Sequence, residues 1–201
     1  METTNLNRKI RLILLKDFTP NHTITSLAKE LKITRTGMWK ILKKLEKQQY
    51  IKLKKIGTGK TSTYIIKLNW NILTEKALAL YLTEESLKQS RWVNNFEELK
   101  DKVDFLIIYG SILHNQEQAN DIDIMGIAKK ENLTKIEETI QKIQKIQHKK
   151  IHSINFTQKE FQQELENKNK AFIEAIKKGA ILFGQEEFIQ FMKDAQKKWT
   201  N

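Results

Sequence analysis

Two short apolar runs separated by a polar segment determine the fold expected for the C-terminal half of this chain. Residues 103–109 read VDFLIIY and residues 121–127 read DIDIMGI. Runs of this length, partly β-branched and bounded by polar residues, indicate buried strands. Gly110-Ser111 ends the first run, and we expect a short helix to begin at Ile112-Leu113.

Asp121 and Asp123 belong to the second of these runs. Alternate side chains share one face of a strand, so both carboxylates point the same way while Ile122 and Ile124 point into the core. At about 7 Å along the backbone, two carboxylates can chelate a hard divalent cation such as Mg²⁺, or Mn²⁺. The alternative is a strand edge with two solvated carboxylates, but the apolar flanks favour a metal site.

Gly110-Ser111 supplies features that suit a phosphate. Glycine lets the backbone come close to a phosphate, and the serine hydroxyl and the first amides of a following helix can hydrogen-bond it. Beside a metal held by the aspartates, such a turn would hold a nucleoside triphosphate for phosphoryl or nucleotidyl transfer.

The combination of Gly110-Ser111, nine further residues and Asp121-Ile122-Asp123 between apolar strands resembles the signature of the polymerase-beta-type nucleotidyltransferase superfamily, especially its minimal members. The resemblance covers residues 95–190. It implies a mixed sheet flanked by helices, with a helix at 131–147, a third strand at 151–156 and an IKKGAILFG turn at 176–184. It also implies Asp121 and Asp123 as catalytic metal ligands, Gly110 and Ser111 as nucleotide-binding residues, and Mg²⁺ or Mn²⁺ with an NTP, ATP by preference.

The third strand departs from that family's pattern. Active members generally carry a third carboxylate there, whereas this chain offers His152, Ser153 and Asn155. Glu160 is the nearest acid that follows, and an amide such as Asn155 is neither a base nor a strong ligand for a hard cation. Either the site works with two acids or it binds nucleotide without turnover. No zinc-site spacing links the histidines, which we expect to be solvated or hydrogen-bonded: His114, His148 and His152.

The first seventy residues predict three helices followed by a hairpin. Apolar positions recur at helical spacing from Leu6 to Asp17, then from a Thr23 or Thr25 cap to Leu31, and from a Thr34 cap to Gln48. Two alternating runs at 50–56 and 62–68 follow, joined by the glycine-containing turn 57–60.

This arrangement resembles winged helix-turn-helix regulators, which place the third helix in the major groove of double-stranded DNA and the wing along the backbone. The resemblance implies contacts to base edges from Thr34, Arg35, Thr36, Trp39 and Lys40. It implies phosphate contacts from Lys43, Lys44, Lys54, Lys55 and Lys60. Each assignment has an alternative. The lysines could form a solvated face of a structural module, and Trp39 could pack against the wing instead of touching DNA.

The charge distribution separates the two halves of the chain. Residues 1–70 hold 16 Lys and Arg against 4 Asp and Glu, so the remaining residues hold 36 − 16 = 20 against 24 − 4 = 20, and the net charge of +12 lies in the first third. A field so concentrated indicates a polyanionic partner, nucleic acid before an anionic membrane. The absence of cysteine, of a membrane-spanning run and of a signal core predicts a cytoplasmic protein.

We therefore expect an α+β protein with a DNA-binding domain at 1–70, a helical connector at 71–100 and a nucleotidyltransferase-like domain at 101–201. One apolar stripe of the connector comprises Ile72, Leu73, Ala77, Leu80, Tyr81 and Leu87. It serves either as the interface of a homodimer, as winged-helix regulators often form, or as packing within the monomer.

Two functions fit these features. In the first, the protein binds DNA and transfers NMP, AMP by preference, from an NTP to a hydroxyl of a protein or nucleic acid. In the second, it is a transcription regulator whose degenerate C-terminal domain senses a nucleotide or binds a partner. By resemblance alone, a variant of the second is antitoxin-like action on a HEPN-type ribonuclease toxin encoded alongside.

Overall fold

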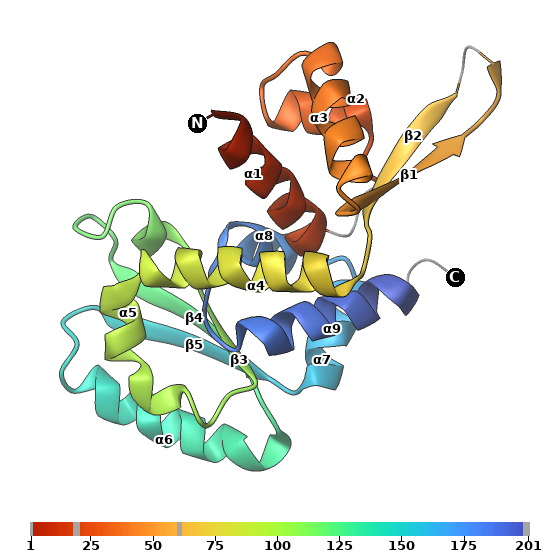
Figure 1. Ribbon diagram of the computed structural model, residues 1–201. Coiled ribbons are helices and arrows are strands. Elements are labelled where there is room, and N and C mark those ends of the chain that lie inside the picture. The colour runs from red at the N-terminus through yellow and green to blue at the C-terminus, as the bar shows by residue number, and fades with distance from the viewer. Residues whose placement is uncertain (1, 18–20, 60–61, 199–201) are drawn as a thin grey trace. The chain divides into compact units, whose positions relative to one another are not determined.

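The computed structural model describes residues 2–17, 21–59 and 62–198. Its backbone contacts divide the chain into two units, residues 1–81 and 82–201, which are described separately. The α-helices of both units and strands β1 to β5 are labelled in Figure 1. Within the described residues, no helix has the length and apolar character needed to cross a bilayer.

The N-terminal unit is three helices followed by a two-stranded hairpin. The elements are α1 (Glu2–Lys16), α2 (Ile24–Glu30), α3 (Arg35–Lys47), β1 (Ile51–Ile56) and β2 (Thr63–Leu68). Threonines begin both short helices: Thr23 forms a capping box with Ser26, and the Thr34 hydroxyl accepts a hydrogen bond of 3.1 Å from the Gly37 amide. These side chains satisfy amides that a helix start leaves without partners. The predicted helices and hairpin are confirmed.

The two strands of the hairpin are antiparallel, and β2 also forms an isolated bridge with the residue that precedes α2. Ile51 pairs with Leu68 and Ile56 with Thr63, and an isolated bridge joins Thr23 to Ile65. One face of the hairpin therefore packs on the helices. The fully buried core of this unit comes from all three helices and the hairpin: Ile10, Leu15, Leu27, Met38, Leu42, Leu45, Ile51 and Ile66.

Helix α4 (Ile72–Leu87) begins in the N-terminal unit and ends in the C-terminal one. In the second half of this helix, the Tyr81 carbonyl accepts a 2.8 Å hydrogen bond from Arg8, and the buried Arg11 guanidinium lies over the Tyr50 and Tyr81 rings. The buried positions of α4 are Thr74, Leu78, Leu82 and Ser86. The apolar stripe expected from the sequence thus lies largely on the other side of the helix, where four residues are exposed: Ile72, Leu73, Leu80 and Leu87.

The C-terminal unit is a four-stranded mixed sheet between two helical layers. Strand order is β5 (Lys150–Phe156), β4 (Asp121–Ile127), β3 (Phe105–Tyr109), β6 (Ala180–Phe183), with β4 and β5 parallel and the other pairs antiparallel. The α+β class and the mixed sheet are confirmed. Strand β6 was missed, because the IKKGAILFG segment was expected to be only a turn.

Helices cover both faces of this sheet, as Figure 1 shows. On one face lie α5 (Ser90–Asn95), η2 (Glu97–Leu99) and α6 (Leu133–Gln144), with η3 (Ser111–Leu113) and η4 (Lys130–Asn132) between strands and helices. On the other lie α7 (Gln158–Glu166), α8 (Lys170–Lys178) and α9 (Gln185–Lys198). The predicted connector is thus helical but divided into separate helices, and the helix expected at 131–147 is the shorter α6, preceded directly by the 3-10 turn η4.

The two faces have different interiors. In the first, aliphatic side chains of the sheet, among them Leu106, Ile108, Ile122, Ile124 and Ile151, pack in one cluster with Trp92 of α5 and the adjacent Phe96. On the second, one end is filled by a cluster of phenylalanine rings whose centroids lie 5.0–6.4 Å apart: Phe105, Phe156, Phe161, Phe172, Phe188 and Phe191. Asp121 and Asp123 lie at the other end of this second face, about four residues along β4 from the rings.

Candidate functional site

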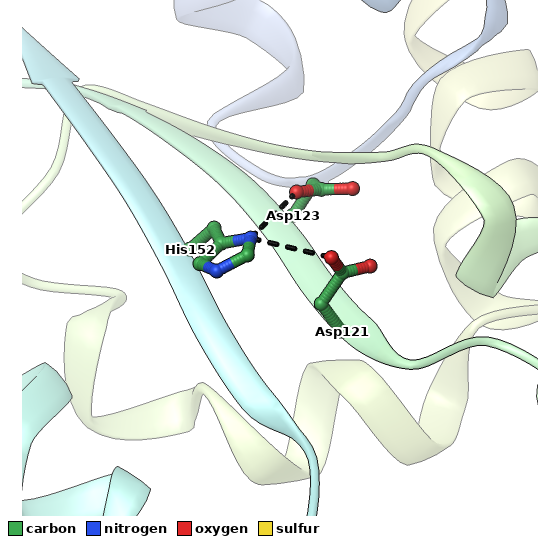
Figure 2. A group of neighbouring side chains, drawn as sticks. All are labelled: Asp121, Asp123 and His152. Atoms are coloured by element: carbon green, nitrogen blue, oxygen red, sulfur yellow. Dashed lines mark ion pairs between the residues drawn. The ribbon is translucent and has the colours of Figure 1, made fainter.

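Asp121, Asp123 and His152 converge on one face of two neighbouring strands (Figure 2). Parallel pairing places Asp123 directly beside His152 and Asp121 beside Lys150. The Nδ1 atom of His152 lies 3.4 Å from Oδ2 of Asp121 and 3.5 Å from Oδ1 of Asp123. The three side chains are 35%, 25% and 45% exposed in that order, so a ligand can reach them from solvent.

Gly110 lies against the second carboxylate. Its backbone has φ 84° and ψ −164°, a conformation almost restricted to glycine. A Cβ atom at this position would lie 2.3 Å from Oδ2 of Asp123. Glycine is therefore required at this position for two reasons. The turn after β3 needs a positive φ, and the Asp123 carboxylate occupies the space that a side chain would need.

Burial and repulsion act together on Asp123. Burial, followed by the charge of Asp121, raises the pKa of the Asp123 carboxyl above its ordinary value of 3.8, and His152 offsets part of this. Between that value and the raised pKa, the folded protein holds a proton that the unfolded chain has lost, so stability falls as pH rises through this window. Burial, together with Asp123, also raises the pKa of the neighbouring Tyr109 hydroxyl.

These three side chains can hold a metal ion. The donor atoms of Asp121, Asp123 and His152 all lie within 4.8 Å of one another. Two carboxylates and one imidazole form a donor set that is common for divalent metals. The residues therefore fit the divalent ion expected from the sequence, and they add a nitrogen ligand that the sequence did not predict.

Ser111 begins a single turn of 3-10 helix, Ser111–Leu113, rather than an α-helix. Its side chain is exposed, and its carbonyl accepts hydrogen bonds from the amides of His114 and Asn115, both 3.0 Å. The polar segment that follows is held by Lys149, whose ammonium donates to the carbonyls of Glu117 and Ala119. Ser111 thus lies at the edge of the site, two residues after Tyr109, the last residue of β3, which pairs with Asp123.

The third strand, which the sequence showed to offer His152, Ser153 and Asn155 in place of an acid, brings one of these three residues to the aspartates. Asn155 pairs with Gly126 and lies on the opposite face of the sheet from the aspartates, and Ser153 donates a 3.3 Å hydrogen bond to it. Glu160 forms the capping box of α7 with Thr157. Only His152 reaches the pair. Ile151 is buried, so alternation along the strand predicts that the His152 side chain lies on the other face of the sheet, and this was the sequence signal for its position.

The predicted DNA-contacting residues of α3 divide into two groups. Arg35, Thr36, Lys40 and Lys44 are exposed. The others also make contacts within the unit: Thr34 caps α3, Trp39 packs on Tyr64 of the wing at 5.1 Å between ring centroids, and Lys43 lies over the Trp39 ring and 2.6 Å from Glu46. Of the two alternatives for Trp39, the wing contact is thus present.

The lysines of the wing lie on opposite faces of the hairpin. Lys55 pairs with Tyr64, and side chains of a cross-strand pair share a face, so Lys55 is on the side that meets α3 through Trp39. Lys54 pairs with Ile65 and points to the other side. Lys60, also predicted to contact DNA, is outside the described residues.

Family models match both halves of the chain. Residues 6–52 match a winged helix-turn-helix DNA-binding model, and residues 93–187 match a model described as polymerase beta, nucleotidyltransferase. The chain is therefore a fusion of these two kinds of domain, as predicted. No significant match was found among curated proteins or among solved structures.

We predict that Gly110→Ala destabilises the protein by about 3 kcal/mol, because it adds the strain of a disfavoured backbone to a clash with Asp123. Urea unfolding measures the change. Gly59→Ala is the matched control: its φ is also positive, at 59°, but no described atom lies within 4 Å of the added Cβ, so its cost is about 1 kcal/mol. Adding Asp123→Ala to Gly110→Ala should restore part of the loss, and strict additivity would contradict the contact.

Proposed function

We propose that this protein binds DNA through its N-terminal domain and transfers a nucleoside monophosphate, AMP by preference, from an NTP to a hydroxyl of a protein or nucleic acid. The observation that carries the proposal is the Asp121–Asp123 pair, held beside Gly110 on an open part of a sheet that matches the nucleotidyltransferase model. Such a site can hold the cation that nucleotidyl transfer requires, and the family resemblance assigns phosphate binding to the Gly110-Ser111 turn beside it.

In this proposal each residue has a defined task. Asp121 and Asp123 hold a divalent ion, Mg²⁺ or Mn²⁺, which when bound neutralises phosphate charge and polarises the α-phosphoryl group. Gly110 lets the backbone approach the triphosphate, and the Ser111 hydroxyl binds it. The acceptor oxygen forms a bond to the α-phosphorus, the bond from that phosphorus to the bridging oxygen breaks, pyrophosphate leaves, and the hydroxyl proton passes to solvent.

The test of transfer is incubation of the full chain with α-labelled NTPs, Mg²⁺ or Mn²⁺ and cell extract. We expect labelled macromolecules with the wild type and a loss of at least about 100-fold with Asp121→Asn or Asp123→Asn, because each removes charge stabilisation of a few kcal/mol. Glu160→Gln is the matched control, since it also removes one carboxylate of this unit but one engaged in a helix cap. Label that persists in both aspartate variants would contradict the proposal.

A second function is favoured by the contacts of His152. A histidine between two aspartates, where active nucleotidyltransferases generally have a third acid, is consistent with a site that binds nucleotide or a partner without turnover. The protein would then be a transcription regulator, or an antitoxin-like protein whose partner is a HEPN-type toxin. DNA binding that survives Asp123→Ala, together with no label transfer, would support this alternative.

For DNA binding, we predict that Lys44→Ala and Lys55→Ala weaken binding to duplex DNA and each reduce the slope of log affinity against log salt by about 1, as loss of one phosphate contact does. Fluorescence anisotropy at several salt concentrations measures both quantities. Lys54→Ala is the matched control on the opposite face of the same strand, and it should have the smaller effect. Equal effects of Lys54 and Lys55 would contradict the assignment of the DNA-facing side.

We propose in addition that α4 pairs with α4 of a second copy. Leu73, Leu80 and Leu87 recur every seven residues and are 50%, 57% and 68% exposed, which is the spacing of a seam between two helices. An antiparallel pair with its two-fold axis at Leu80 places Leu73 opposite Leu87 of the other copy.

Leu80→Glu is predicted to convert a homodimer into a monomer, since it puts two carboxylates together on the axis. Light scattering after size-exclusion chromatography measures the mass, for which the monomer value is 23.7 kDa. Ile146→Glu, at an exposed apolar position of another segment, should leave the mass unchanged. A wild-type chain that is monomeric at micromolar concentration would rule out this pairing.

A further inference from the structure

We infer that His152 is the third ligand of the metal site, and that this ligand shifts the site's preference from Mg²⁺ toward transition-metal ions such as Mn²⁺ and Zn²⁺. The inference rests on the proposed metal-dependent function of Asp121 and Asp123, and it names the class of ion that they take. It concerns binding, so it can be tested without the transfer reaction.

The separations of the donor atoms fit two ligands on one ion. Nδ1 of His152 is 3.4 Å from the nearer oxygen of Asp121 and 3.5 Å from that of Asp123. Two ligands bound at about 2.1 Å in tetrahedral geometry are about 3.4 Å apart. The imidazole is therefore spaced from each carboxylate as two ligands of one ion would be, and all three donor atoms lie within 4.8 Å of one another.

The fold holds His152 in this position. Its strand is paired with β4 over seven consecutive residues, from Asp121–Lys150 to Ile127–Phe156, so the histidine cannot slip to another register without exposing Ile151. The Oδ1 atom of Asp123 faces the imidazole while Oδ2 lies over Gly110. The direction of this carboxylate is thus set by the contacts on its two sides.

The donor chemistry determines the preferred ion. Mg²⁺ takes oxygen ligands almost exclusively and is held by carboxylates and phosphates. Imidazole nitrogen binds Zn²⁺ and other first-row transition ions well, and exchanging a carboxylate for a neutral imidazole also lowers the negative charge of the site by one. Both changes weaken Mg²⁺ more than they weaken Mn²⁺ or Zn²⁺.

A different role for His152 predicts the opposite result. A protonated imidazole between the two aspartates would stand in for a cation and compete with metal. Removing a ligand lowers metal affinity, whereas removing an internal cation raises it. The sign of the change on His152→Ala therefore separates the two roles.

The experiment measures the dissociation constants of the full chain for three metal ions, each with and without ATP. Electron paramagnetic resonance gives the value for Mn²⁺, competition with a chromogenic chelator gives that for Zn²⁺, and competition with Mn²⁺ gives that for Mg²⁺. We expect His152→Ala to weaken Mn²⁺ and Zn²⁺ binding about tenfold or more, by analogy with the loss on removing groups that support a ligand. His152→Asp should shift the preference of the site back toward Mg²⁺, so the Mg²⁺ dissociation constant divided by the Mn²⁺ dissociation constant should fall. His148→Ala, an exposed histidine of the same unit, should change nothing.

Three outcomes would overturn the inference. Tighter metal binding by His152→Ala would show that the histidine acts as an internal cation. Metal binding that needs Asp121 and Asp123 but is unchanged in both His152 variants would refute the inference and leave the proposed function intact. No metal binding by the wild type, with or without ATP, would reject the proposed function as well. Circular dichroism of each variant shows whether it folds.

Discussion

The parallel pairing of β4 with β5 in a single register determines what the candidate site contains. It aligns Asp123 with His152 and Asp121 with Lys150 on one face, and it aligns Ile122 with Ile151 on the other. Because Ile122 and Ile151 are both buried, the register cannot shift by one residue without turning an apolar side chain to solvent and a polar one into the core. The aliphatic core under α5 and α6 thus holds the site from the opposite side of the sheet.

The second face of the sheet explains where the site can be. Its far end is filled by six phenylalanine rings from the strands and from α7, α8 and α9, which leave no room for solvated carboxylates. At the near end the carboxylates keep about a quarter to a third of their surface in contact with solvent. Partial burial is costly for two neighbouring charges, and the raised pKa of Asp123 reflects that cost. A bound cation would offset the same repulsion between Asp121 and Asp123, so this repulsion favours the binding of a cation.

The sequence predicted those parts of the site that depend on short-range rules. Alternation along β4 was sufficient to place Asp121 and Asp123 together, and Thr34 was recognisable as a helix cap. The contact of Gly110 with Asp123 joins residues on different strands, so a turn signal alone does not show it. The role of His152 depends on pairing across 29 residues of chain, and an apolar pattern does not specify which residues of two strands are opposite. Strand β6 has four residues between a helix and Gly184, too few for a strand pattern to be distinguished from a turn.

The separation of charge in the sequence is consistent with a division of labour between the two domains. The DNA-binding type of domain carries the whole net charge of +12, and the nucleotidyltransferase type of domain carries none. A neutral domain is not drawn along a polyanion by long-range attraction, so the N-terminal domain must provide the affinity for DNA. The exposed side of α3 and the Lys55 side of the wing hold the cations suited to this, and the wing is attached to α3 by the Trp39–Tyr64 contact. The DNA binding and the nucleotidyl transfer that we propose would therefore depend on different residues, and substitutions can separate them.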